Sequence, residues 1–406
     1  MCALDRNTDV IIIGAGASGM TAAVRAAERG KRVLLIEKAD RPGRKIYASG
    51  NGRCNMMNSG DLRYFGDVSF AEKILQHCTR DDLSAFFRRY GLLFAEENEG
   101  RVYPITFQSS SVVSSLRNAL ELNKSTLILN DAVLSAEQDS SRFKVYTKSG
   151  HIYTSDRLIV ACGGAAQPKL GGNCDGYRIL TSFGHKLIPV KPSLVPLNTD
   201  PRSISGLSGV RVRCSVTIYK GDMPVHSEDG EVLFTDYGVS GICIMQCARF
   251  AGEDETYLEL NLMKDAFQNS EQCKAELKRR RVFFSGLSPL CLLNGILPER
   301  LSYAVLKQAG VPLRGETAGE TSDEMIEQIV ASGAAYRIRI TGNRGMDYAQ
   351  VTAGGIDCAG FNAATLQSKI IPGLYAAGEV LNVDGDCGGF NLMFAFAGGL
   401  IAGGSV

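Results

Sequence analysis

The sequence has 406 residues, of which 45% are hydrophobic and 21% are charged, and its 44 basic and 43 acidic side chains leave a formal net charge of +1. This length predicts two or three domains with large cores, and the composition argues against both a disordered chain and a membrane protein. The balanced charge gives no general attraction to nucleic acid or to acidic membranes, so we expect neither as a partner.

Twelve cysteines are scattered along the chain, and no two have the CxxC spacing of a zinc site, an iron–sulfur cluster or a redox dithiol. The four histidines, His77, His151, His185 and His226, also lack the spacing of metal ligands, and we expect them on the surface or in turns. The apolar run at residues 10–13 is too short for a signal peptide. We therefore expect a cytoplasmic protein with reduced thiols and no metal site.

Residues 9–13 (DVIII) predict a buried strand, which leads directly into Gly14, Gly16 and Gly19 in GxGxxG spacing. An alanine-rich helix is predicted over 20–29 and a second buried strand over 31–37. In such a unit the glycines permit a tight turn, the approach of a pyrophosphate and close packing of the helix. Glu37 ends the second strand, where a carboxylate accepts hydrogen bonds from ribose hydroxyls and repels a ribose phosphate. The unit predicts binding of FAD or NAD rather than NADP.

Two further segments distinguish between these dinucleotides. Residues 41–58 (RPGRKIYASGNGRCNMMN) combine glycines with cations, which predicts a concave anion site for a diphosphate and for the N1–C2=O edge of a reduced flavin. Near the other end, residues 373–389 lead from a strand through Gly378, Glu379 and Asp386 to a predicted apolar helix over 390–403. A polar loop and a helix N-terminus are what the ribityl and ring portions of an extended cofactor need, which favours FAD.

The middle of the chain changes character from residue 189 onward, where three prolines fall within eight residues. Residues 210–219 and 231–235 predict strands between glycine turns, as in a small barrel or sandwich. Residues 263–332 are mostly helical in pattern, and 336–341 (YRIRIT) predict a returning strand. Four consecutive cations at 278–281 could contact nucleic acid or an anionic substrate, but a solvated helix face is the favoured interpretation.

These segments resemble the HI0933-like flavoproteins, which include aminoacetone oxidase-like proteins and bile-acid reductases acting on conjugated 3-oxo compounds. The resemblance runs nearly end to end, and its most specific pieces are RCN at 53–55, VTAGGI at 351–356 and AGEVLNVDGDCGGFNLMFAFAGG from 377 onward. It implies an α/β fold with a parallel sheet. The Rossmann-like FAD-binding domain would comprise residues 1–190 and 346–406, with an inserted β-barrel-like subdomain at 191–261 and 333–345 and a small helical subdomain at 262–332.

The resemblance also implies non-covalent FAD and indicates the residues around it. The expected neighbours are Gly14, Gly16, Ala17, Ser18, Gly19, Glu37, Lys38, Arg44, Lys45, Ser49, Gly50, Asn51, Arg53, Val133, Gly378, Glu379, Asp386, Asn391 and Leu392. Val133 is included because residues 130–133 (NDAV) resemble the strand whose backbone meets adenine. Cys54 and Cys387 fall in segments expected near the flavin, although neither has a second cysteine at dithiol spacing.

The bile-acid branch of the family implies an FAD-dependent oxidoreductase. In this hypothesis NAD(P)H is a transient electron donor, and flavin N5 passes a hydride to the conjugated C=C bond of a 3-oxo bile acid or steroid-like enone. Tyr47, Tyr103 and Tyr237 are unranked candidates for polarising the carbonyl. One alternative is an oxidase of a small amine such as aminoacetone, and another is a flavin-containing binding or regulatory protein that holds RNA through residues 278–281. The leading hypothesis predicts a small-molecule substrate, and no sequence feature specifies an oligomeric state.

Overall fold

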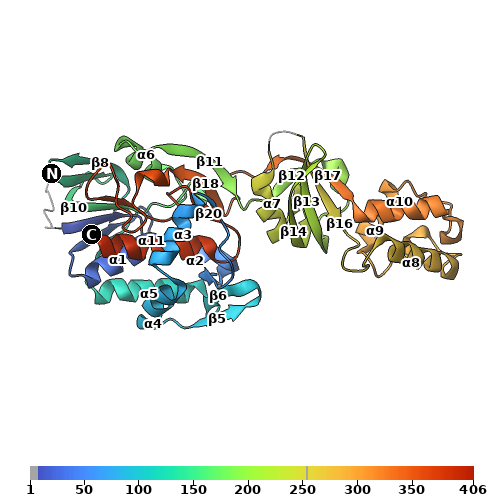
Figure 1. Cartoon of the computed structure of the whole chain (residues 1–406), viewed down its shortest axis with the longest axis horizontal. Helices are drawn as coiled ribbons and strands as arrows, with labels where there is room; N and C mark the ends of the chain where they lie inside the picture. The colour runs from blue at the N-terminus through green and yellow to red at the C-terminus, as the bar shows by residue number, and fades with distance from the viewer. Residues whose placement is uncertain (1–7, 253–254) are drawn as a thin grey trace. The chain divides into compact units, whose positions relative to one another are not determined.

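The computed structural model describes residues 8–252 and 255–406. The chain forms two compact units, Met1–Pro192 with Gln350–Val406, and Ser193–Ala349. The first unit is therefore built from both ends of the chain, and the second is a single inserted segment. Figure 1 shows strands and helices mixed in the first unit and a barrel followed by helices in the second.

The main sheet of the first unit has the strand order β7-β2-β1-β10-β9-β8. Its parallel core comprises β1 (Thr8–Ile13), β2 (Val33–Ile36), β7 (Thr126–Ile128) and β10 (Ile152–Val160), and β19 (Leu374–Ala376) also pairs in parallel with β10. The strands β8 (Val133–Asp139) and β9 (Arg142–Thr147) add an antiparallel edge. The runs VIII and VLLI are buried because a parallel sheet is covered on both faces, as the sequence predicts.

The first helix, α1 (Ala17–Glu28), packs along the last helix, α11 (Phe390–Ser405), which Figure 1 shows side by side. Two glycines of α11 allow the backbones to touch. A Cβ atom at Gly399 would lie 2.0 Å from Thr21 Oγ1, and one at Gly403 would lie 2.2 Å from the Ala22 carbonyl oxygen. The glycine-rich C-terminal sequence is thus required for this close helix contact.

Smaller elements complete the first unit. The helices are α2 (Arg44–Ala48), α3 (Val68–His77), α4 (Arg80–Arg89), α5 (Ser109–Leu122) and α6 (Asp175–Ser182). The short strands are β3 (Met57–Asn58), β5 (Phe94–Glu97) and β6 (Arg101–Pro104) in one sheet, β4 (Tyr64–Gly66) with β20 (Val383–Gly385), and β11 (Leu187–Ser193) with β18 (Val351–Ile356). The pairing of β4 with β20 brings an N-terminal segment beside the C-terminal loop.

The second unit contains a closed barrel in the order β12-β15-β14-β13-β16-β17. Its strands are β12 (Leu197–Thr199), β13 (Arg211–Lys220), β14 (Met223–Phe234), β15 (Gly238–Ser240), β16 (Thr256–Asn261) and β17 (Tyr336–Asn343), and α7 (Ile242–Cys247) follows β15. Along β13 the alternate residues Cys214, Val216 and Ile218 are buried. This alternation fills the barrel interior, and closure decides between the predicted barrel and sandwich in favour of the barrel.

The predicted helical segment, which lies within the second unit, forms α8 (Ser270–Phe283), α9 (Glu299–Gln308) and α10 (Asp323–Ala334). The four cations at 278–281 do not form a free basic face, because they make ion pairs and hydrogen bonds with other groups of this segment. Lys278 and Arg281 each pair with Asp323 at 2.7 Å, and Arg280 donates to two backbone oxygens at 2.6 and 3.2 Å. The run therefore stabilises the packing of α8 on its neighbours.

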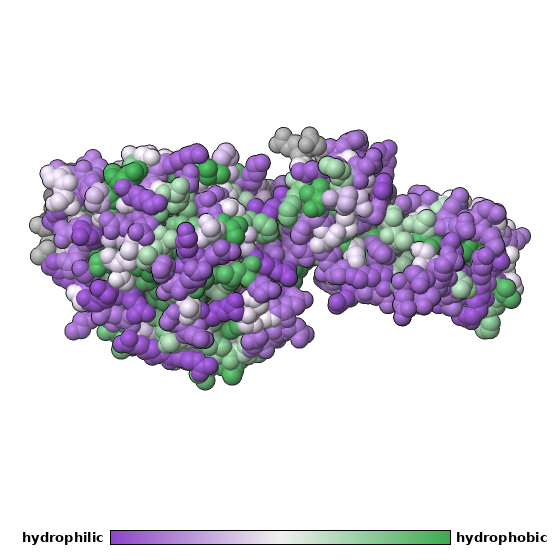
Figure 2. Space-filling view, viewed as in Figure 1, coloured by the Kyte–Doolittle hydropathy of each residue, from purple (hydrophilic) through white to green (hydrophobic). Residues whose placement is uncertain are grey.

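The surface in Figure 2 is mostly hydrophilic, with scattered hydrophobic patches. Within residues 8–252 and 255–406, no helix combines the length and apolar character needed to cross a membrane, and no cluster of three potential ligand side chains could hold a metal ion. The eleven cysteines of these ranges are free, and Cys2 lies outside them. Burial raises the pKa of Cys54 to about 12, so its thiol stays protonated at neutral pH.

His185 differs from the expectation that the histidines lie on the surface or in turns, because it is buried. Its ring stacks on Phe361 with centroids 4.2 Å apart, and its Nε2 lies 2.9 Å from Ser368 Oγ. Burial lowers the pKa of this imidazole. An aromatic neighbour distant in the sequence buries His185, and the local sequence gives no sign of it.

Candidate dinucleotide-binding site

The loop between β1 and α1 has the geometry that the glycine spacing predicts. Gly14 has a φ of +99°, and a Cβ there would lie 2.6 Å from the Ala161 carbonyl oxygen. A Cβ on Gly19 would lie 1.8 Å from the Gly14 oxygen, whereas one on Gly16 would meet no atom within 4 Å. The first turn of α1 contains no acidic residue, and no side chain caps it. The open space at Gly16 and this helix terminus fit a pyrophosphate.

Glu37 follows β2 and accepts two backbone hydrogen bonds. Its Oε2 accepts from the Ala15 N–H at 2.7 Å, and its Oε1 accepts from the Ala39 N–H at 2.9 Å. These bonds hold the carboxylate beside the glycine loop, and each oxygen keeps an acceptor site free for a ribose hydroxyl. The Asp131 N–H donates to the Glu37 carbonyl oxygen at 3.1 Å, which brings the segment leading to Val133 to the same end of the sheet.

The basic segment lies against the same loop. The Gly43 N–H donates to the Ala15 carbonyl oxygen at 2.8 Å, immediately before α2. On α2, Arg44 donates to the Lys169 carbonyl oxygen at 2.9 Å, and Lys45 Nζ forms a 3.0 Å ion pair with Glu379 Oε2. Lys38 is exposed next to Glu37 in the sequence. The structure thus brings Lys45 of α2 together with the predicted C-terminal residue Glu379.

The C-terminal loop packs on α1 and leads into α11. A Cβ at Gly378 would lie 2.5 Å from Ser18 Oγ, so this position has no room for a side chain. Asn391 accepts from the Gly385 N–H at 2.8 Å and donates to the carbonyl oxygens of Gly385 and Asp386 at 2.8 and 3.3 Å. Leu392 follows in the first turn of α11, which no side chain caps. The loop therefore presents a second free helix terminus within the first unit.

Arg53 makes different contacts from the other predicted cations. Ser49, Gly50 and Asn51 form a short turn, in which Gly50 and Asn51 have φ values of 55° and 54°. The Arg53 guanidinium carbon then lies 4.4 Å from the ring centroid of Tyr103 and 4.5 Å from that of Phe107. It also pairs with a carboxylate of β5, that of Glu97, at 2.6 Å. The described contacts place Arg53 with this aromatic pair rather than with Glu379.

The three tyrosines considered for carbonyl polarisation lie in different surroundings. Tyr103 is buried beneath Arg53, and burial raises its pKa. Tyr47 lies under the Arg41 guanidinium at 5.4 Å. Tyr237 belongs to the second unit.

Sequence reasoning missed two residues that line this region, Thr352 and Tyr177. Thr352 is buried on β18, donates its N–H to Glu379 Oε1 at 2.9 Å and accepts from the Ala166 N–H at 2.9 Å. The Tyr177 hydroxyl is buried, and burial together with the Glu379 charge raises its pKa. Thr352 lies within the VTAGGI motif, so that motif was its available signal, whereas Tyr177 had none.

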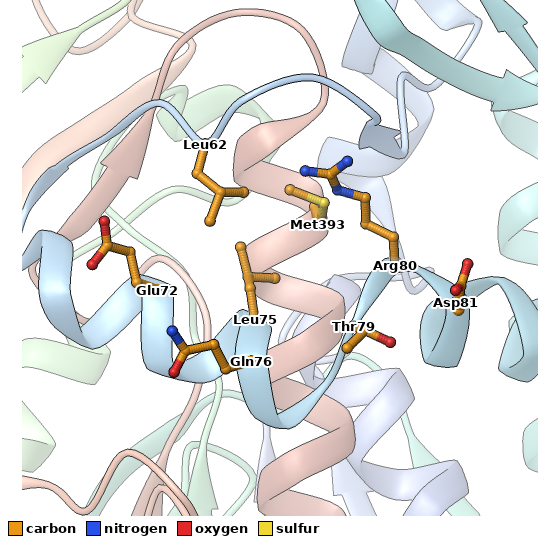
Figure 3. A pocket seen from close by; sticks show the side chains of 8 residues that line it. All are labelled: Leu62, Glu72, Leu75, Gln76, Thr79, Arg80, Asp81 and Met393. Carbon is orange, nitrogen blue, oxygen red and sulfur yellow. The ribbon is translucent and has the colours of Figure 1, made fainter.

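A separate hollow of about 660 Å³ lies between α3, α4 and α11 (Figure 3). Leu62, Leu75 and Met393 form its apolar part, and Glu72, Gln76, Thr79, Arg80 and Asp81 complete its lining. Arg80 donates to the carbonyl oxygens of the neighbouring residues 59 and 60. None of the predicted cofactor residues lines this hollow, so the dinucleotide assignment depends on the loops described above.

A parallel sheet with a glycine-rich βαβ unit, a carboxylate after its second strand and an inserted barrel define an FAD-binding oxidoreductase of the Rossmann type. The chain belongs to the family described as HI0933-like protein Rossmann domain, whose model matches residues 8–405. This match confirms the family expected from the motifs.

Named relatives match over nearly the whole chain. The chain is 32% identical over 410 residues to the 3-dehydro-bile acid delta(4,6)-reductase of Clostridium scindens, covering 97% of each protein. It is 29% identical over 395 residues to the ribosomal RNA dihydrouridine synthase of Escherichia coli, covering 96% of this chain and 95% of the relative. Among solved structures, the 3-ketosteroid-delta4-(5alpha)-dehydrogenase of Rhodococcus jostii RHA1 is similar in fold, with a TM-score of 0.50, 15% identity and coverage of 99% and 97%.

Proposed function

We propose that this protein is an NAD(P)H-dependent reductase of a C=C bond conjugated with a carbonyl group. The proposal is supported by the match, over nearly the whole chain, to two relatives whose names describe the addition of hydrogen to a C=C bond. One is named as a delta(4,6)-reductase of a 3-dehydro bile acid, and the product of the other, dihydrouridine, has two more hydrogens than uridine across a ring C=C bond beside a carbonyl. Both names therefore describe the addition of hydrogen to the same kind of bond.

When bound, FAD supplies the hydride chemistry. We propose that the predicted residues hold it without a covalent link. The N-terminus of α1 and the open face of Gly16 would bind the pyrophosphate, and Glu37 would accept hydrogen bonds from the adenosine ribose. The Lys45–Glu379 pair and the N-terminus of α11 would bind the ribityl and flavin end. The sequence has no second GxGxxG unit, so NAD(P)H would act as a transient donor.

A 3-oxo bile acid or steroid-like enone is the substrate class we favour, because the bile-acid reductase has the higher identity. A uracil in ribosomal RNA is a second candidate, supported by the 29% match to the synthase. The cations at 278–281 already bind protein groups, so they add no support for RNA as the substrate.

The experiment is anaerobic stopped-flow absorbance of the purified holoprotein mixed with NADH or with NADPH. Fast loss of the oxidised flavin band, followed by fast reoxidation with a 3-oxo-4-ene steroid and slow reoxidation with oxygen, is the expected result. Reoxidation by a uridine-containing ribosomal RNA fragment instead of the steroid would favour the second candidate. Failure of both nucleotides to reduce the flavin would reject the reductase proposal, and peroxide formation from aminoacetone would then support the amine oxidase hypothesis.

A further inference from the structure

At one edge of the barrel, Arg344 lies between two tyrosine rings. Its guanidinium carbon is 4.4 Å from the ring centroid of Tyr237 and 4.3 Å from that of Tyr348. Tyr237 belongs to the turn between β14 and β15, whereas Arg344 and Tyr348 belong to the segment that follows β17. Two cation–π contacts, one from each ring, restrict the guanidinium.

The Arg344 side chain has no acidic partner in the described part of the chain. Its Nε atom is buried and forms no hydrogen bond within residues 8–252 and 255–406. Asp236 and Asp347 lie next to the two tyrosines in sequence, yet neither forms an ion pair with Arg344. Arg337 provides a contrast on the same barrel, because it also lies over a tyrosine, Tyr257, but pairs with a carboxylate of β16 at 2.9 Å.

A second polar atom without a partner belongs to the same edge. Asn198 donates its amide to the Asn343 carbonyl oxygen at 2.9 Å, and it faces Gly238 across the pairing of β12 with β15. These two partners immediately precede Arg344 and follow Tyr237 in sequence. The Asn198 Oδ1 atom is buried without a hydrogen bond to a described residue. Buried polar groups are usually paired in folded proteins, so the unpaired Arg344 N–H donor indicates a place for an acceptor group of a ligand, whereas the Asn198 oxygen, itself an acceptor, would take a ligand hydroxyl or amide donor.

We propose that Arg344, held between Tyr237 and Tyr348, binds the carboxylate of an acidic enone substrate. This inference rests on the proposed reductase function and specifies its substrate class. The guanidinium donors form a planar fork that matches the two oxygens of a carboxylate, and the tyrosine rings offer apolar surface to the carbon skeleton beside it. A phosphate of RNA could also accept from the fork, and the oligonucleotide in the test below distinguishes it from a carboxylate.

The test measures equilibrium binding to the oxidised holoprotein by titration calorimetry. The probes are a 3-oxo-4-ene steroid with a side-chain carboxylate and a neutral steroid with the same enone ring. Arg344→Gln should weaken binding of the acidic probe by about 10- to 100-fold, as expected for loss of a charged hydrogen bond. The affinity for the neutral probe should change less than about twofold. Arg337→Gln is the matched control and should leave both affinities unchanged. Arg344→Lys should recover only part of the affinity, because it keeps the charge but loses the fork.

Tyr348→Ala is a second variant, suited to the case in which Arg344→Gln fails to fold, because Tyr348 is 52% exposed. This variant should also weaken binding of the acidic probe while leaving the affinity for the neutral probe nearly unchanged. Equal weakening of both probes, no effect on either, or absence of steroid binding by the wild-type protein would overturn the proposal. Binding of a uridine-rich oligonucleotide that is lost in Arg344→Gln would overturn it in favour of a phosphate.

The calorimetric result is independent of turnover. Arg344-dependent binding of the acidic probe without reduction of the flavin by either nucleotide would retain the carboxylate site and reject the reductase. Reduction of the neutral enone with an unchanged acidic-probe affinity in Arg344→Gln would retain the reductase and reject the carboxylate site.

Discussion

Lys45 and Glu379 are 334 residues apart in the sequence, and their side chains form a 3.0 Å ion pair in the first unit. Both side chains are largely shielded from solvent, and the second carboxylate oxygen of Glu379 accepts from the Thr352 N–H. This contact ties the basic segment after β2 to the loop before α11. The candidate cofactor site is therefore assembled from both chain ends, with the second unit inserted between them in sequence.

Substitutions of two glycines in the same loop should separate cofactor binding from stability. Gly16→Ala introduces a Cβ into open space, so the free energy of unfolding of the apoprotein should change by less than about 1 kcal/mol. Its FAD affinity should fall at least about tenfold, because the methyl group would occupy the space for the pyrophosphate. Gly19→Ala places a Cβ 1.8 Å from the Gly14 oxygen and should lower both the free energy of unfolding and the FAD affinity. Urea unfolding and titration of apoprotein with FAD measure them, and full FAD affinity in Gly16→Ala would contradict the assignment of this loop.

Replacement of Glu37 by Gln should weaken FAD binding by about 10- to 100-fold, the range for loss of charged hydrogen bonds. The amide of Gln offers one acceptor oxygen, whereas the carboxylate now accepts from Ala15 and Ala39 with both of its oxygens. Glu121→Gln, on the exposed surface of α5, is the control and should bind FAD as the wild type does. Quenching of flavin fluorescence during titration reports the affinity, and equal affinities for all three proteins would show that Glu37 does not contact the cofactor.

Replacement of Arg279 and of Arg280 should lower the unfolding free energy by different amounts, although both arginines pair with Glu276. The Arg280 side chain is 16% exposed and donates to two backbone oxygens, so Arg280→Gln should cost about 1–3 kcal/mol of unfolding free energy. The Arg279 side chain is 63% exposed, and Arg279→Gln should cost less than about 0.5 kcal/mol. Chemical denaturation measures the unfolding free energy of the two variants and of the wild type. An RNA-binding role for this run would instead make Arg279 the residue whose loss weakens salt-sensitive RNA retention.

Stability should fall as the pH decreases below about 6.5, in part through His185. Burial lowers the pKa of the folded imidazole, so between that value and the ordinary value of about 6.5 the unfolded chain binds a proton that the folded chain does not. Protons therefore favour unfolding in this range, and the effect disappears above it. Urea midpoints at pH 7.5 and about pH 5.5 should differ less in His185→Gln than in the wild type. An unchanged difference would assign the acid sensitivity to other groups, and His77→Gln, at an exposed position, serves as the control.

The sequence alone determined the βαβ unit, because its signals are local. Apolar runs of strand length, three glycines at fixed spacing and an acid after the second strand lie within forty residues. In the structure Gly19 packs on Gly14 within this segment, Gly14 packs on Ala161 at the end of β10, and Gly16 faces open space. The strands over 210–219, 231–235 and 336–341 and the helix over 390–403 were predictable for the same reason, since burial on alternate or all faces leaves a periodic pattern, whereas β12, β15 and β16 were not predicted.

Tertiary structure decided which of these pieces meet. Barrel closure depends on the pairing of β12 with β17, which are separated by more than a hundred residues, and no local pattern distinguishes it from a sandwich. Tertiary contacts also produce three side-chain environments that the sequence did not reveal. These are the burial of His185 against Phe361, the hydrogen bonds of Arg280 to backbone oxygens, and the two tyrosine rings at Arg344. In each case at least one neighbour of the polar side chain lies outside its own helix, strand or loop: Phe361 for His185, the segment at 292–294 for Arg280, and Tyr237 for Arg344. Such partners fix its charge, its exposure and its free hydrogen-bonding groups, which spacing along one chain does not encode.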